Sequence, residues 1–243
     1  MKKVALVTGA SKGLGLEWVK QLASRGYTVY LSARDLKSAQ EAALMTGYMD
    51  AIIPVALDVC DENQLQSLAK QVQQSFGFIN LIINNAGVNP KDYADKTRMA
   101  KAFYLDQLDA REVLDVIHTN SIAPLLVVKH FRHLLKSASK PIVVNISSWL
   151  GSVSQLSFGG HYAYTGSKNL LNIFNKSMAF ELKADGIICV NVNPGWVQTA
   201  MGGAKANFTT EQAVQQLFAN VIDSITLNDS GRFIHYDGTD HAW

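Results

Sequence analysis

Tyr164 and Lys168 are the two residues whose types and spacing most clearly predict chemistry. They stand four positions apart in the segment 162–183, which has a helical pattern, so both side chains share one face. A positive charge ~4 Å from a phenol, at an effective dielectric of ~20, favours the phenolate by ~4 kcal/mol and lowers its pKa of about 10 by ~3 units. The pair therefore predicts a tyrosine that exchanges protons near neutral pH. Tyr162 lacks such a partner, because position 166 is glycine.

A hydroxyl pair, Ser147 and Ser148, follows the apolar run Ile142–Ile146. A hydroxyl at the end of a strand can donate a hydrogen bond to a substrate oxygen on which negative charge develops. The pair therefore predicts a residue that orients the substrate.

A glycine-rich turn, Thr8–Gly15, joins the apolar run Val4–Thr8 to a predicted helix, with the spacing G-x-x-x-G-x-G. Glycines let the backbone turn tightly and approach a pyrophosphate, and the helix N-terminus offers free N–H groups to that anion. Between a first strand and a first helix, the turn predicts a dinucleotide site; a purely structural turn is the alternative. The residues assigned to the site are Gly9, Ser11, Lys12, Gly13, Leu14 and Gly15.

Arg34 follows the second predicted strand, about 20 residues after Gly15, where the ribose 2′ group is read in this kind of site. An acid there would accept from a 2′-hydroxyl, whereas a guanidinium matches a 2′-phosphate, and Lys12 can add a second positive charge. Asp35 is the counter-argument, and we expect it to pair with a neighbouring base. The sequence therefore favours NADP(H) over NAD(H).

These residues need a framework of alternating strands and helices. Short apolar runs, several of them apolar on both faces, alternate with longer helical patterns, which predicts one doubly wound α/β domain. We expect a single-domain Rossmann fold over residues 1–243, with about seven parallel strands and helices on both faces. The predicted strands are Val4–Thr8, Thr28–Ala33, Ile52–Leu57, Leu81–Asn84, Ile142–Ile146, Ile188–Asn193 and Phe233–Tyr236, and the predicted helices are Leu14–Ser24, Asp61–Phe76, Asp109–Leu135, Tyr162–Lys183 and Thr210–Ile225.

Two segments lack a regular pattern, the charged stretch Val88–Leu108 and the shorter Gly202–Phe208. The first follows a strand, at the edge where α/β sheets bind ligands, so both segments are candidate lids. Ordinary surface loops are the alternative interpretation.

Composition excludes several classes of protein. Apolar residues make up 48% of the 243 and charged residues 17%, which excludes a disordered chain. The net charge of +2 does not indicate binding to nucleic acid or to an anionic membrane. No apolar run approaches the ~18 residues of a membrane span, and the N-terminal run is too short for a signal peptide. Cys60 and Cys189 form no C-x-x-C, which fits a reducing compartment, so we expect a cytoplasmic protein. His130 and His133 have no evident third ligand, so we expect no metal site.

The chain resembles the short-chain dehydrogenase/reductase family over essentially its whole length. The motifs are, in order, Thr8–Gly15, Asp58-Val59, Asn84-Asn85-Ala86-Gly87, Asn120, Ser147-Ser148, Tyr164-x-x-x-Lys168 and Asn193–Thr199. Within the family, Pro194–Gly203, the ending Tyr236–Thr239 and Trp243 are similar to the branch of C-factor and sniffer-like carbonyl reductases.

The resemblance implies a role for each matching residue. It places the substrate-orienting serine at Ser148, with Ser147 as the alternative, and makes Asn120 part of a water-linked proton relay to Lys168. It also implies that Lys168 anchors the nicotinamide ribose. The implied cofactor contacts are Asp58 and Val59 at the adenine, Asn85, Ala86 and Gly87 at the adenine ribose, and Pro194, Gly195, Val197 and Thr199 at the nicotinamide.

The resulting expectation is an NADPH-dependent enzyme that reduces a small-molecule ketone, aldehyde or quinone to an alcohol by hydride transfer, with Tyr164 as general acid–base. One alternative is a 3-oxoacyl-thioester reductase of lipid or polyketide synthesis, which a basic patch at Lys96, Arg98 and Lys101 would support. Another is a non-enzymatic NADP-binding signalling protein. The resemblance also implies a homodimer or homotetramer built on the two long helices.

Overall fold

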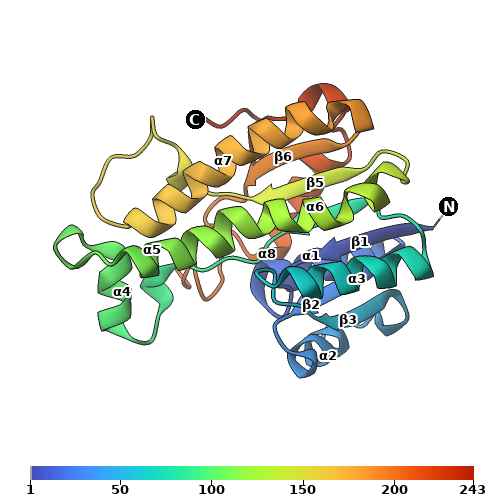
Figure 1. Ribbon diagram of the computed structural model, residues 1–243, viewed down its shortest axis with the longest axis horizontal. Helices are drawn as coiled ribbons and strands as arrows, with labels where there is room; N and C mark the ends of the chain where they lie inside the picture. Colours follow the sequence, from blue (N-terminus) through green and yellow to red (C-terminus); the bar gives the residue numbers. More distant parts are fainter. Residues whose placement is uncertain (1) are drawn as a thin grey trace.

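Seven parallel strands form the centre of the protein in a computed structural model that describes residues 2–243. Their order is β3-β2-β1-β4-β5-β6-β7, and every neighbouring pair is parallel. This confirms the predicted doubly wound sheet (Figure 1). The strands are β1 Lys3–Val7, β2 Tyr27–Ala33, β3 Ile52–Ala56, β4 Leu81–Asn84, β5 Ile142–Ile146, β6 Ile188–Asn193 and β7 Phe233–His235.

Helices cover both faces of the sheet, because alternate residues of one strand point to opposite faces. In β1, Ala5 and Val7 join a core with α1, α2 and α8, whereas Val4 and Leu6 join a second core with α3, α6 and α7. Both faces of the strand are therefore buried, as its continuous apolar run predicts. The helices are α1 Gly13–Ser24, α2 Leu36–Leu44, α3 Glu62–Ser75, α4 Lys96–Phe103, α5 Ala110–Ile117, α6 Ala123–Lys136, α7 Tyr162–Leu182 and α8 Thr210–Leu217.

Two helices lie where the sequence pattern predicts none. The segment Val88–Leu108, expected to be irregular, contains α4, whose N-cap Asp95 accepts hydrogen bonds from the backbone of Thr97 and Arg98. Helix α2 starts in the same way, at the N-cap Asp35. Both helices are short and bury only alanines on the side that packs, so their apolar periodicity is weak. Their Asp N-caps were the available signal.

The predicted helix Asp109–Leu135 is interrupted by a π-helical segment, His118–Ile122, between α5 and α6. A second π-helical segment, Phe218–Ile222, follows α8 inside the predicted helix Thr210–Ile225. A π-helical turn inserts an extra residue into the helix and often marks a functional position. Here the first of them contains Asn120.

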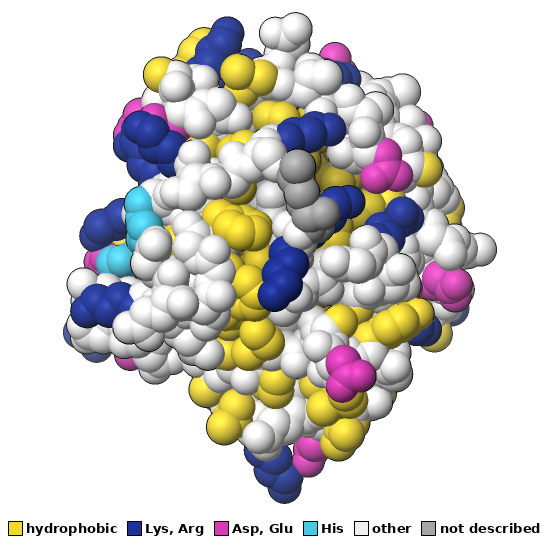
Figure 2. All heavy atoms as spheres, turned by 90° about the vertical axis from the view of Figure 1, so that its right-hand side faces the viewer, with side chains coloured by type: hydrophobic (Ala, Val, Ile, Leu, Met, Phe, Trp, Pro, Cys, Tyr) yellow, Lys and Arg dark blue, Asp and Glu magenta, His cyan; other side chains and the backbone are white. Residues whose placement is uncertain are grey.

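The strand order reverses between β1 and its neighbours β2 and β4, which creates a crevice at the carboxyl ends of the strands. These ends lie on the left of Figure 1, together with α4 and the start of α7. Figure 2 shows the opposite end, where hydrophobic side chains lie between scattered lysines and arginines. Among residues 2–243, no helix is long and apolar enough to cross a bilayer.

Candidate active site

The glycine-rich turn is tightly packed against the chain that follows β4. Gly9 and Gly13 adopt left-handed φ angles of 61° and 59°, which glycine tolerates best. A β-carbon at Gly9 would lie 2.8 Å from the Cα of Ala86, and one at Gly15 would lie 2.6 Å from the carbonyl oxygen of Gly9. Glycine is therefore required here by both conformation and space.

Asn85, directly after the end of β4, holds the turn in place. Its Nδ2 donates to the carbonyl oxygens of Thr8, at 3.0 Å, and Gly9, at 2.9 Å. In return, the Thr8 hydroxyl accepts from the backbone N–H groups of Asn85 and Ala86, each at 3.0 Å. The structure thus gives Thr8 a positioning role that the sequence analysis did not assign, although its place before the first glycine was visible.

Residues after β6 face the same turn. A β-carbon at Gly13 would lie 3.4 Å from Cγ2 of Thr199, so the first turn of α1 and the chain beyond Gly195 approach each other. Gly195 has a φ of 79°, and a β-carbon there would lie 2.9 Å from the ring of Tyr236. Gly13, expected at the pyrophosphate, and Thr199, expected at the nicotinamide, are therefore brought together.

Arg34 lies exposed beyond β2, and Asp58 lies exposed two positions beyond the end of β3. The two strands pair with Ala33 opposite Ala56, so both residues lie at the same edge of the sheet. The expectation that Asp35 pairs with a neighbouring base is wrong. Its carboxylate caps α2, accepting from the backbone N–H and the hydroxyl of Ser38, both at 2.8 Å. Those hydrogen bonds hold the pKa of Asp35 below its usual value.

Tyr164 and Lys168 lie one turn apart on α7, and both are buried, with 7% and 6% of their surface exposed. The Lys168 ammonium donates to the carbonyl oxygen of Ile146 at 2.7 Å and stands 5.8 Å from the centre of the Tyr164 ring. The Tyr164 hydroxyl donates to the sulfur of Met201 at 3.8 Å. The predicted pair is thus on one face, beside the end of β5.

The pKa of Tyr164 shifts in the direction opposite to the prediction. Burial raises it to about 12; a hydrogen bond with Ser148 lowers it, and the carboxylate of Asp92 raises it. Burial also lowers the pKa of Lys168 to about 8. The spacing argument allowed for the nearby charge but not for the loss of water around both groups. Tyr164 is therefore a protonated acid at neutral pH, and Lys168 is mostly charged.

The two serines after β5 differ in their surroundings. Ser147 is 3% exposed, and its hydroxyl donates to Oδ1 of Asn172 at 2.7 Å, inside the core. Ser148 is half-buried, accepts from the backbone N–H of Leu150 at 3.2 Å, and forms the hydrogen bond with Tyr164 that lowers the tyrosine's pKa. Ser148 is therefore the serine placed beside the phenol.

Asn120 is 1% exposed, in the π-helical segment between α5 and α6. Its Oδ1 accepts from the backbone N–H of Val88 at 2.8 Å, and its Nδ2 donates to the carbonyl of Val88 at 2.9 Å and the hydroxyl of Ser167 at 3.0 Å. The side chain thus ties the chain after Gly87 to α7, three residues from Tyr164. Its predicted part in a water relay stays a prediction.

A buried ladder of asparagines, which the sequence analysis missed, joins the sheet to α7. Asn84 donates to Asn145 at 2.8 Å across β4 and β5, and Asn145 donates to Asn175 of α7 at 2.9 Å. On the neighbouring strand, Asn191 donates to Asn172 of α7 at 2.8 Å. An Asn within each of three apolar strands was the signal, because a buried amide needs a partner.

Cys60 and Cys189 are both free thiols, as predicted. Burial raises the pKa of Cys189 to about 12, so it is an unreactive thiol. His130 contacts the carboxylate of Glu62 at 2.9 Å. Among residues 2–243, no group of three or more potential ligands is placed to hold a metal ion.

Comparison with known proteins identifies the family of this chain. Residues 3–224 match the family profile described as short chain dehydrogenase. The C-signal protein of Myxococcus xanthus is 34% identical over 174 residues, which are 69% of this chain and 94% of that protein.

Two solved structures share the fold over the full length of this chain. The NADPH-bound carbonyl reductase from chicken fatty liver has a TM-score of 0.88 and 31% identity, with 99% of that chain covered. The carbonyl reductase Sniffer of Drosophila melanogaster has a TM-score of 0.89 and 28% identity, with 100% covered. The chain belongs to the short-chain dehydrogenase family of oxidoreductases.

Proposed function

We propose that the protein reduces a carbonyl compound, a ketone, aldehyde or quinone, to an alcohol with NADPH. The observation that carries the proposal is the placement of Tyr164, a buried acid that is protonated at neutral pH, beside Ser148 and on one helix face with Lys168. A glycine turn built for an anion lies at the same edge of the sheet. The two carbonyl reductases of similar structure support the same reaction class.

The residues present fit a dinucleotide. Gly9 and Gly15 leave no room for side chains, and the N-terminus of α1 directs free N–H groups and a partial positive charge at the space beyond the turn. Arg34 and Lys12 are both exposed cations, and Arg34 lies next to a carboxylate already engaged as a helix cap. These charges favour a 2′-phosphate and hence NADP(H) over NAD(H). When bound, the reduced nicotinamide supplies the hydride for the carbonyl carbon.

The chain's own residues supply the proton and orient the substrate. Tyr164 donates its phenolic proton to the carbonyl oxygen, and Ser148 donates a hydrogen bond to the same oxygen. The Lys168 ammonium, 5.8 Å from the ring centre, favours the phenolate that remains. Because burial lowers the pKa of Lys168 to about 8, this help is lost as the pH rises above that value.

Two alternatives receive less support. A reductase of carrier-bound acyl thioesters would need a free basic patch at Lys96, Arg98 and Lys101. Arg98 is instead paired with Glu112 at 2.6 Å and Asp115 at 3.3 Å, which reduces its charge toward a partner. A signalling protein would not need the buried Tyr164 and Lys168. The cytoplasmic location and the homodimer or homotetramer stay predictions.

The test is NADPH oxidation over a panel of ketones, aldehydes, quinones and acyl thioesters. We expect turnover of simple carbonyl compounds, with little turnover of Tyr164→Phe. Tight NADPH binding without turnover of any carbonyl compound would favour the signalling alternative. Arg34→Ala tests the cofactor assignment, and we expect kcat/KM for NADPH to fall ~10–10²-fold, as loss of a charge-assisted contact implies, with NADH little affected.

A further inference from the structure

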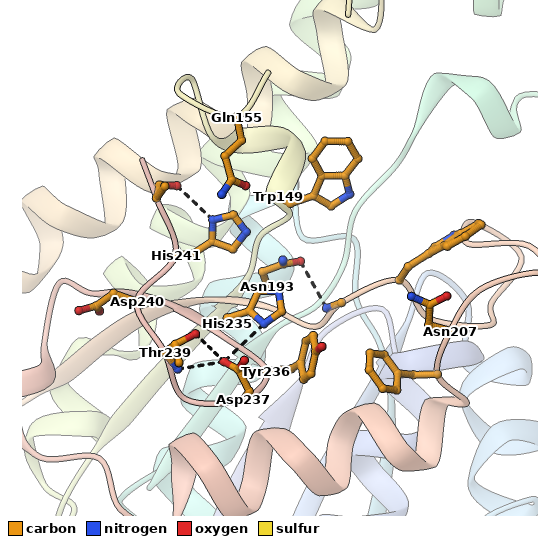
Figure 3. A pocket seen from close by; sticks show the side chains of 14 residues that line it. Trp149, Gln155, Asn193, Asn207, His235, Tyr236, Asp237, Thr239, Asp240 and His241 are labelled. Carbon is orange, nitrogen blue, oxygen red and sulfur yellow. Dashed lines mark hydrogen bonds and ion pairs between the residues drawn. The ribbon is translucent and has the colours of Figure 1, made fainter. Parts of the chain in front are cut away.

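A cavity of about 440 Å³ lies beyond the carboxyl ends of β5, β6 and β7 (Figure 3). One wall is the C-terminal segment from Tyr236 to Ala242, and the facing walls are the turns after β5 and β6. Its volume is within the ~300–1,000 Å³ of small-molecule sites. Its residues are not among those that the resemblance assigns to the nicotinamide, except Gly195.

Two residues of the lining adjoin segments that carry residues of the candidate active site. Trp149 lines it and directly follows Ser148. Trp196 also lines it, and its indole N–H donates to the carbonyl of Gly202 at 2.7 Å, next to the Met201 that contacts the Tyr164 hydroxyl. The cavity therefore adjoins the segments that carry Ser148 and Met201.

Aromatic rings make up the apolar part of the lining. Phe208 and Tyr236 meet edge to face, with ring centres 4.7 Å apart, and Trp149 and Trp196 are both partly exposed. Flat rings in a partly open cavity present large apolar faces at little entropic cost. This lining favours a flat, unsaturated ligand.

The polar part of the lining combines two carboxylates with amides, Thr239 and two histidines. Within the described chain, Asp237 and Asp240 are its carboxylates, and it contains no lysine or arginine. Asp240 is paired with Arg232, which lies outside the lining, at 2.7 Å. Asp237 accepts from the backbone N–H and the hydroxyl of Thr239, which hold its pKa below the usual value and keep it ionised.

His235 lies beside this carboxylate. Its Nδ1 lies 3.5 Å from the Asp237 carboxylate and is buried with no hydrogen-bond partner among residues 2–243 (Figure 3). The side chain of Asp237 is 48% exposed and stays open to a further partner. The cavity thus combines flat apolar walls with one half-exposed carboxylate that has no lysine or arginine partner and one imidazole beside it.

We propose that this cavity binds the non-reacting part of the carbonyl substrate, and that Asp237 makes it select flat substrates bearing a positive charge over anionic ones. The proposal rests on the proposed carbonyl reduction and adds to it a substrate class. It also implies poor use of substrates whose remote end is anionic.

The test compares three acetophenones that differ only at the para position: a trimethylammonium group, a carboxamide and a carboxylate. kcat/KM is measured for the wild type, for Asp237→Asn, and for Asp50→Asn as a matched control. Asp50 is an exposed aspartate beside β3, at the opposite edge of the sheet from β7. Asparagine keeps an acceptor oxygen for Thr239 while removing the charge. Binding of the same compounds is followed independently by quenching of tryptophan fluorescence, since Trp149 and Trp196 line the cavity.

We expect the wild type to prefer the cationic over the anionic ketone. In Asp237→Asn that ratio should fall about seven- to fiftyfold, because a unit charge ~7 Å away at an effective dielectric of ~40–80 changes the cationic and the anionic ketone ~3–7-fold each, in opposite directions. The carboxamide should change less than about twofold. Asp50→Asn should keep the wild-type ratio, and added salt should reduce it. Equal ratios in the wild type and Asp237→Asn, or a preference for the carboxylate, would overturn the proposal. If no ketone is turned over, the proposed reduction fails, while the fluorescence ratios still support or overturn the charge selectivity.

Discussion

Helix α7 carries two regions of buried polar side chains, and the two regions differ in how these side chains are accommodated away from water. In its first two turns, Tyr164 and Lys168 are ionisable groups whose pKa values are shifted to about 12 and about 8 by burial. Two turns further on, Asn172 and Asn175 are neutral amides whose oxygens and nitrogens are all hydrogen-bonded to the sheet or to neighbouring backbone.

The difference shows which region stabilises the fold and which performs chemistry. The hydrogen-bonded amides of α7 fix one arrangement of strands and helix. On the strands, Oδ1 of Asn84 and of Asn191 is buried without a partner among residues 2–243. A buried lysine with a lowered pKa costs free energy at neutral pH, and such costs are typical of functional sites. We therefore expect substitutions in the two regions to have opposite effects on stability and activity.

The largest expected effect is on the rate of Lys168→Met. Removing the ammonium raises the cost of the phenolate left on Tyr164, so kcat should fall ~10²–10⁴-fold, the range of general acid–base catalysis. The measurement is steady-state NADPH oxidation with the best ketone of the panel. A loss below about threefold would mean that the lysine does not assist the phenol.

Two adjacent serines contact different regions of α7: Ser148 lies beside Tyr164, and Ser147 is hydrogen-bonded to Asn172. Ser148→Ala should reduce kcat ~10²–10³-fold, as loss of an oxyanion donor does, with little change in stability. Ser147→Ala should leave kcat within about threefold and cost ~1 kcal/mol of unfolding free energy, because it removes a buried hydrogen bond to Asn172. The reverse pattern, in rate and urea-unfolding measurements, would assign the substrate to Ser147.

Breaking the ladder at Asn145→Ala should destabilise the protein by ~2–4 kcal/mol. The substitution leaves Nδ2 of Asn84 and Oδ1 of Asn175 without the partners they have now, and both residues are buried. Chemical denaturation measures the loss. A change below about 0.5 kcal/mol would show that the amide ladder does not stabilise the sheet.

Lys168→Met should instead stabilise the fold at pH 7. Burial lowers the lysine's pKa from 10.5 to about 8, which destabilises the folded wild type by ~3 kcal/mol below pH ~8. The variant avoids this cost but loses the hydrogen bond to Ile146, which destabilises it by ~1 kcal/mol. The net gain of ~2 kcal/mol should disappear by pH ~10, because between those pKa values the unfolded chain holds a proton that the folded chain has released. Denaturation of both proteins at several pH values checks the sign; a destabilised variant at pH 7 would contradict it.

Most strands and the main helices could be predicted from the sequence, because the residue patterns that define them are local. Apolar runs gave the seven strands, and the glycine spacing and the Tyr164–Lys168 interval gave the turn and the helix face that the structure contains. The short helices α2 and α4 escaped, because charge and capping rather than apolar periodicity define them.

Other features depend on tertiary packing, which spacing does not encode. The pKa of Tyr164 rises because the fold removes water from it, and no interval along the chain reports that burial. The amide ladder joins residues from three strands and a helix. The cavity likewise forms only where the C-terminal segment meets the turns after β5 and β6.

The most direct test of the central claim, that Tyr164 delivers the proton, is single-turnover oxidation of bound NADPH by Tyr164→Phe and by Tyr162→Phe. Tyr162 lies on the same helix two residues earlier and is 41% exposed, so it is a matched control. We predict that Tyr164→Phe binds NADPH normally but reacts at least ~10²-fold more slowly, with Tyr162→Phe within about twofold of the wild type. A Tyr164→Phe variant that reacts at the wild-type rate would contradict the account.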